Sequence, residues 1–288
     1  MRPALVFLFL CFTAPSAFAA AEGSPYGVET AAWPRKNTSH FAIVHESAMA
    51  PQAIAMELEK IYSKLRMHMA AFAPWMDKQK TTVYIYATQE SYQASSFGPP
   101  KWSEALALPS SHAVLVYDQN DIENMRRVLT HELSHVFFGS FFVSNPDALP
   151  LWLDEGMATN MEETVVSHRA QALLGADVKS FPAFTTFTQN VPSASDPSDV
   201  VVGWYLQAFG TVKYMYGTRS KLQFITYCKK LLAGSTPEQA LWEAYKIRNW
   251  KLFDERWRAW LQNEQGSSKG GGLSSGSSFT SSYSLFNK

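Results

Sequence analysis

The 288-residue chain predicts an α+β fold, in which a small mixed β-sheet packs on one long helix and a mainly helical half follows. Two patterns support this prediction. Before residue 120, several short segments alternate apolar and polar residues, as half-buried strands do. After residue 120, apolar residues recur every three or four positions, which is the spacing of amphipathic helices. Long helices after a sheet-forming segment are typical of an α+β domain.

The first nineteen residues have the pattern of a secretory signal peptide. Arg2 supplies a positive start, residues 4–12 form an apolar run too short to span a membrane, and Ala17-Phe18-Ala19 resembles a cleavage site. An uncleaved anchor is the alternative. Cleavage predicts an exported protein, periplasmic or secreted, with no transmembrane segment. Only Cys228 would then remain, so no disulfide can form within the chain.

The mature chain begins with an extended leader, residues 20–37, and continues into a sheet-containing part, residues 38–119. Apolar periodicity within the sheet-containing part predicts a helix over residues 51–72. Glycine and proline at positions 98 to 100 predict a loop over residues 95–111. Three strands are predicted, over residues 40–45, 82–86 and 112–117.

A helical part, residues 120–264, follows the sheet-containing part. Asn120 and Glu123 form a predicted capping box that starts its first helix. This helix contains His131-Glu132-Leu133-Ser134-His135. Positions four apart lie on one helical face, so the two imidazoles can bind a single metal ion.

The chemistry implied by this spacing is that of a zinc hydrolase. Glu132 lies beside the first ligand, where its carboxylate can act as a general base on a zinc-activated water. Catalytic zinc usually has three protein ligands, and Glu155 in Leu151-Trp152-Leu153-Asp154-Glu155-Gly156-Met157-Ala158 is the natural third. We therefore expect one Zn²⁺ per chain, although neighbouring first-row metals would also bind such a set. The alternatives are two core histidines on an amphipathic helix and, for Glu155, a solvent-facing acid at a helix start.

These two segments resemble those of the gluzincin metallopeptidases of clan MA, most closely the small bacterial peptidase MA-like domains. The resemblance covers residues 38 to 262. It implies a zincin-like fold and zinc-dependent hydrolysis of a peptide or protein substrate. Because gluzincins bind the substrate backbone at the edge strand of the sheet, His112 to Val116 are expected to take that role. Residues 106 to 116 hold no acid and no Gly-Ala-Met-Glu-Asn motif, so strict aminopeptidase activity is not expected.

Gluzincins also need a donor for the oxyanion that forms when water attacks the amide carbonyl. Tyr205 shares a helical stripe with apolar residues and is the expected donor. Tyr214 and Tyr216 are the next candidates, and a core tyrosine is the alternative reading of Tyr205. The one histidine that follows the zinc motifs, His168, lies in a polar context and is expected at the surface.

Three features complete the chain. Residues 177–200 show little periodicity and are predicted to form a loop over the cleft. Residues 265–288 are rich in Gly and Ser and predict a disordered tail. Between them lies a predicted packing stripe at helical spacing, formed by Trp250, Phe253, Trp257, Trp260 and Leu261.

Other functional classes are weighed against the metallopeptidase. The formal net charge is zero and no cationic run occurs, so nucleic-acid binding is not expected. The chain could instead be a non-catalytic zinc- and peptide-binding module of the cell envelope, or a metal hydrolase of a non-peptide substrate. No pattern in the sequence predicts an oligomeric state or a cleavage specificity.

Overall fold

A computed structural model describes residues 32–270 apart from 48–51, 102, 194 and 219. Side chains are described for this range except at 163–167 and 269–270. The chain divides into two compact units, residues 1–146 and 147–288, and each is considered by itself. The predicted signal peptide, the first part of the leader and the end of the predicted tail lie outside the described residues. Within them, no helix combines the length and the apolar character that crossing a membrane requires.

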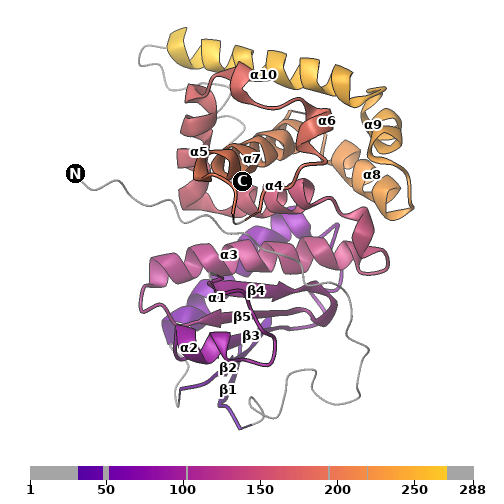
Figure 1. The fold of residues 1–288 in the computed structure, drawn as a ribbon. Coiled ribbons are helices and arrows are strands. Elements are labelled where there is room, and N and C mark those ends of the chain that lie inside the picture. Colours follow the sequence, from indigo (N-terminus) through magenta and orange to yellow (C-terminus); the bar gives the residue numbers. More distant parts are fainter. Residues whose placement is uncertain (1–31, 48–51, 102, 194, 219, 271–288) are drawn as a thin grey trace, which may run out of the picture. The chain divides into compact units, whose positions relative to one another are not determined.

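The first unit contains a mixed five-stranded sheet in the order β1-β2-β3-β5-β4 (Figure 1). Strands β2, β3 and β5 run parallel, while β1 and β4 are antiparallel edge strands. This confirms the predicted mixed sheet. The strand bounds are Arg35–Asn37 for β1, Phe41–His45 for β2, Thr81–Tyr86 for β3, Ala105–Leu108 for β4 and Ala113–Tyr117 for β5.

Helices cover both faces of this sheet. Helix α1, Gln52–Met69, connects the parallel strands β2 and β3 and packs against α3, Ile122–Gly139. Helix α3 packs in turn on β4 and β5, as predicted for the helix that carries the histidine motif. The short helix α2, Gln89–Gln93, contributes Tyr92 to a core cluster with Val44, Tyr84 and Leu115 on strands of the sheet. The sheet therefore holds α3 in place.

Three expectations about the strands were wrong. The predicted loop 95–111 contains strand β4, whose four residues are too few to show a periodic pattern. Strand β5 begins at Ala113, because His112 has a left-handed backbone with φ of 48°. Moreover, β5 pairs with β3 on one side and β4 on the other, so it is not an edge strand. Among the strands that the structure describes, β4 forms the edge on this side of the sheet.

The start of helix α3 differs by one residue from the prediction. Asn120 has φ of 54°, a left-handed conformation that asparagine tolerates and that an N-cap does not adopt. Asp121 is the N-cap instead, and its carboxylate accepts hydrogen bonds from the backbone N–H groups of Glu123 and Asn124. The helix itself is confirmed.

The second unit is helical, which confirms the predicted helical half. Within it, α4 packs against α7 and α8 packs against α9. A π-helical segment, Lys213–Gly217, continues from the end of α7. The helices are α4 (Leu151–Met161), α5 (Glu163–Gly175), α6 (Phe184–Phe187), α7 (Ser198–Val212), α8 (Lys221–Leu232), α9 (Pro237–Tyr245) and α10 (Trp250–Gly270).

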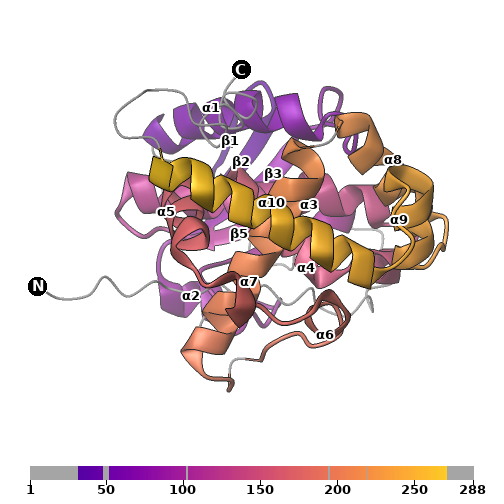
Figure 2. The same ribbon diagram turned by 90° about the horizontal axis from the view of Figure 1, so that it is seen from above.

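Helix α10 runs from α9 back to α5 and packs on α5 and α6 (Figure 2). Its aromatic stripe is a packing stripe, as predicted, with Phe253 and Trp257 fully buried. The expected loop over a cleft, residues 177–200, was wrong over its first half. There, Phe184 of α6 is buried against Trp250, Phe253 and Trp257, so this segment is part of the core.

Helix α10 also extends beyond residue 264, where the predicted tail begins. The side-chain amide of Gln265 donates hydrogen bonds to the backbone carbonyls of Leu173 and Ala176 at 3.2 and 2.9 Å. These bonds fix the last turns of α10 to the end of α5. The composition of residues 265–288 did not predict this contact of Gln265 with α5.

Candidate metal centre

The two histidines of the motif converge in the first unit. His131 and His135 are one turn apart on α3, both are buried, and their Nε2 atoms are 3.0 Å from each other. Two imidazole nitrogens on one tetrahedral zinc ion, each about 2.0–2.1 Å from it, would be about 3.3 Å apart. The observed separation is close to this value, so both nitrogens point to a common position and the pair fits a metal ion.

Packing along α3 fixes the helix that carries these side chains. Leu129, Leu133 and Val136 of this helix are buried in the core. Phe137 contacts the rings of Tyr62 and Trp75 from the preceding part of the chain. Because the helix is anchored along its length, the histidines have little freedom to move apart.

Glu132 follows His131 in the sequence, and its side chain is completely buried. Removing a carboxylate from water is costly unless positive charge, a metal or hydrogen bonds compensate. A core position on an ordinary amphipathic helix would be apolar. The burial of Glu132 therefore favours a chemical role over the reading of His131 and His135 as core histidines.

In the second unit, Glu155 is also completely buried. Every residue of α4 from Trp152 to Met161 is buried, including Asp154 beside it. This excludes the alternative of a solvent-facing acid at a helix start. Trp152 and Leu153 lie in the core, as expected from their apolar character.

Helix α4 is fixed to α7 by two contacts close to Glu155. Gly156 allows a close approach, because a Cβ atom there would be 2.6 Å from the carbonyl oxygen of Ala208. Asn160 donates hydrogen bonds from Nδ2 to the carbonyl oxygens of Gly156 and Phe209 at 2.7 and 3.0 Å. Sequence reasoning missed Asn160, although an asparagine within a buried helical stretch was a signal of a specific role.

Tyr205 is buried on α7, as its helical stripe predicted. Its ring contacts Trp204 edge-on, with centroids 5.2 Å apart. Arg169 of α5 lies against the same ring, with Cζ 6.0 Å from the centroid, and donates a hydrogen bond to Thr159 of α4. Tyr205 is thus linked to the helix that carries Glu155. Nothing in the sequence pattern indicated Arg169.

The two other tyrosine candidates take part in packing. Tyr214 contacts Phe253 and Trp260 of α10. Tyr216 lies edge-on to Phe224 of α8, and burial raises its pKa above the ordinary value. Tyr205 is therefore the best of the three candidates for a donor near α4.

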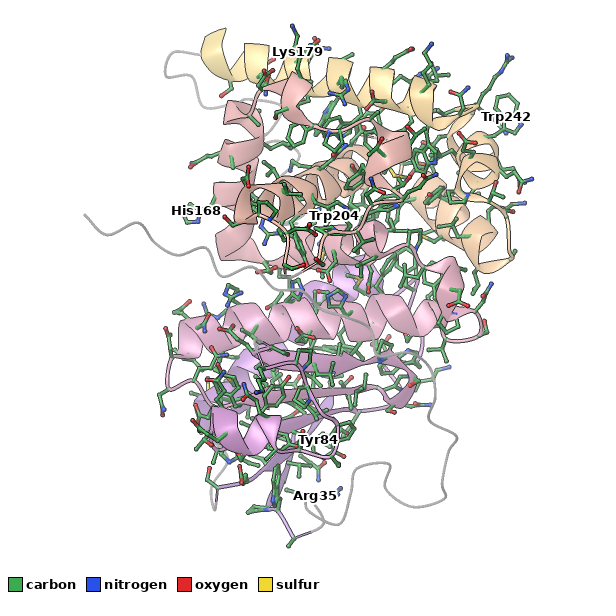
Figure 3. The ribbon with its side chains drawn as sticks, in the orientation of Figure 1. Arg35, Tyr84, His168, Lys179, Trp204 and Trp242 are labelled. Atoms are coloured by element: carbon green, nitrogen blue, oxygen red, sulfur yellow. The ribbon has the colours of Figure 1, made fainter. Side chains whose placement is uncertain are left out.

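His168 is exposed on α5 and points away from the neighbouring helices (Figure 3). Among the residues that the structure describes, His131, His135 and Glu155 are buried side chains of the kinds that could hold a metal ion. Nitrogen and oxygen donors of this kind suit zinc.

Comparison with known proteins agrees with the geometry. The comparison with curated proteins found no match to the chain. A model of the peptidase MA superfamily matches residues 65–263, a range that includes α3 with its two histidines, α4 with Glu155 and α7 with Tyr205. The matched range is more than half of the chain. The chain therefore belongs to the peptidase MA superfamily.

Proposed function

We propose that this protein is an exported zinc metallopeptidase of the gluzincin type. The observation that carries the proposal is the pair His131 and His135, buried with their Nε2 atoms 3.0 Å apart on a helix within the superfamily match. The neighbouring carboxylate of Glu132 distinguishes such a helix from a site that only binds metal, because binding alone does not need a base.

In this proposal His131, His135 and Glu155 hold the zinc ion. Zinc, when bound, lowers the pKa of water towards neutrality and polarises the carbonyl of the substrate. Manganese, cobalt or other first-row ions could occupy the same donors. Identification of the native metal is therefore part of the test.

The protein's own side chains would move the protons. Glu132 accepts a proton from the attacking water and later passes it to the nitrogen of the leaving amine. Tyr205 donates its hydroxyl proton in a hydrogen bond to the oxyanion that develops on the attacked carbonyl. Both groups are buried, so water competes weakly with these interactions.

The edge strand β4, rather than β5, is the part of the sheet that can bind a peptide backbone. Its residues Leu106 to Leu108 are half-buried, and among the described residues β4 pairs only with β5. An extended peptide could add to the other side by main-chain hydrogen bonds. Helix α3 packs against β4, so this edge is close to the helix with the histidine motif.

Export is proposed from the sequence of residues 1–19. N-terminal sequencing of the protein isolated from its native host tests it, since cleavage would leave residue 20 or a close neighbour as the first residue. An intact Met1 on protein recovered from the cytoplasm would contradict export. The peptidase proposal does not depend on this result.

Metal content and peptide cleavage, measured together, test the catalytic proposal. Elemental mass spectrometry should find about one zinc per chain in the wild type and none in His131→Ala, in line with a single three-ligand site. His168→Ala is the matched control, because it removes an exposed histidine and should retain zinc. Cleavage of a mixed peptide library, read by mass spectrometry, should occur with the wild type.

The outcomes separate the three functional classes. Zinc with peptide cleavage supports the metallopeptidase. Zinc without cleavage of any peptide favours either a binding module or a hydrolase of another substrate. A wild type that takes up no metal when zinc is offered refutes the proposal.

A further inference from the structure

Arg169 joins two helices of the candidate site in the second unit. From α5, its Nη1 atom donates a hydrogen bond to Oγ1 of Thr159 at 2.9 Å. Its Cζ atom is 6.0 Å from the centroid of the Tyr205 ring on α7. Thr159 lies one turn after Glu155 on α4, on the same helical face. A single side chain therefore contacts both the helix of the proposed ligand and the proposed oxyanion donor.

Both partners of Arg169 are buried. Thr159 is 1% exposed and Tyr205 is 4% exposed, while Arg169 is half-buried. A guanidinium over a tyrosine ring is attracted by the negative face of the ring, and the attraction is stronger where water is excluded. The hydrogen bond to Thr159 fixes where the guanidinium lies, so the ring is held relative to α4.

The position of the ring decides where the hydroxyl group of Tyr205 lies. This hydroxyl is at the far end of the ring and moves with any swing about the Cα–Cβ bond. An oxyanion donor must be about 2.7–3.1 Å from the developing charge. A displacement of about 1 Å in such a group can cost about a hundredfold in rate.

We propose that Arg169 is a positioning residue, which holds the ring of Tyr205 so that its hydroxyl can donate to the oxyanion. The proposal rests on the proposed function for its catalytic consequence. It makes a geometric claim as well, that the orientation of Tyr205 depends on Arg169, and this claim can be measured without turnover.

A double-mutant cycle tests the catalytic consequence. Tyr205→Phe should lower kcat about a hundredfold, the usual loss for one oxyanion donor. Arg169→Met should lower kcat about tenfold with KM changed less than about twofold, because a displaced donor still contributes part of its effect. Arg169→Lys should be intermediate, since lysine keeps the charge but loses the planar fork.

The double variant decides the question. If Arg169 acts through Tyr205, Arg169→Met combined with Tyr205→Phe should be no slower than Tyr205→Phe alone. Effects that multiply, or an Arg169→Met enzyme with wild-type kcat, would overturn the proposal. Arg258→Met is the matched control, because Arg258 is also partly buried in the second unit but donates to the carbonyls of Phe181 and Pro182. It should lower the melting temperature and leave kcat unchanged.

Fluorine NMR of metal-free protein labelled with 3-fluorotyrosine gives the second readout. The Tyr205 signal is assigned by its loss in Tyr205→Phe. Arg169→Met should shift and broaden this signal, whereas Arg258→Met should leave it unchanged. An unchanged signal in Arg169→Met overturns the proposal even if the protein cleaves no peptide. Failure of the peptidase function would instead appear as absent turnover in the wild type, with the fluorine result still deciding the role of Arg169.

Discussion

Gly156 of α4 lies so close to Ala208 of α7 that a Cβ atom at position 156 would be 2.6 Å from the carbonyl oxygen of Ala208. The same atom would be 2.7 Å from Cγ2 of Val212. Real Cβ atoms do not approach backbone oxygens this closely, so only glycine allows the two helices to pack in this way. Because Glu155 precedes Gly156, the contact also sets where its carboxylate lies relative to α7.

Replacement of Gly156 by alanine should therefore destabilise the protein. Overpacking against backbone costs up to about 3 kcal/mol, which exceeds the roughly 1 kcal/mol that alanine gains over glycine in a helix. Gly203→Ala is the matched control, since Gly203 lies on α7 and a Cβ atom there would have no neighbour within 4 Å among the described residues. Urea denaturation should show loss of stability at position 156 and a small gain at 203. Equal shifts at the two positions would contradict the close packing.

Asn160→Ala should weaken the packing of α4 on α7 by removing hydrogen bonds. The change removes two buried hydrogen bonds, to the carbonyl oxygens of Gly156 and Phe209. The expected loss of stability is about 2 kcal/mol, since each neutral buried hydrogen bond contributes about 1 kcal/mol. Asn263→Ala on the exposed face of α10 should change stability by less than about 0.5 kcal/mol. Thermal denaturation of both variants measures the difference, and similar values would argue against a bridging role.

Glu132→Gln should separate catalysis from metal binding. Glutamine has nearly the same shape but cannot accept the proton, so kcat should fall by about 10²–10⁴-fold while the zinc content stays the same. Glu123→Gln, an exposed carboxylate on the same helix, should retain wild-type turnover. Peptide turnover with parallel metal analysis gives both numbers. Activity of Glu132→Gln within about tenfold of the wild type would rule out the base assignment.

Lys213 provides a prediction about pH. It lies on the π-helical segment that follows α7 and is 2% exposed. Burial lowers its pKa from 10.5 to about 8, although the charge of Glu264 acts to raise this pKa. Between pH 8 and 10.5 the unfolded chain keeps a proton on this lysine that the folded protein has lost. The unfolded state then binds more protons, so the contribution of Lys213 to the free energy of unfolding rises with pH across this window.

Lys213→Met should remove this rise. The variant should be more stable than the wild type below pH 8, and the difference should shrink towards pH 10.5. The total change is at most about 3.5 kcal/mol, because the pKa falls by about 2.5 and each whole unit of pKa corresponds to about 1.4 kcal/mol. Urea denaturation of both proteins from pH 7 to 10.5 isolates the effect, since other groups titrate equally in both. A difference that grows with pH would contradict the assignment.

The sequence alone was sufficient to identify the histidine pair. Spacing of four residues within a helix brings His131 and His135 to one face by local backbone geometry, which no distant contact needs to complete. The apolar stripes of α3, α7 and α10 were predictable for the same reason, because helical periodicity is a property of neighbouring residues. The superfamily match agrees with the conclusion drawn from these motifs.

Only the tertiary structure decided the features that depend on residues far apart in the chain. Strand β4 exists because β5 supplies its hydrogen-bonding partners, and that pairing turned the expected edge strand into an interior one. The burial of Glu155 and the approach of Gly156 to Ala208 follow from the packing of two helices. So does the contact of Arg169 with Tyr205. A local pattern fixes which side chains share a face of one element, but the neighbour that this face meets is set by the packing of the whole core.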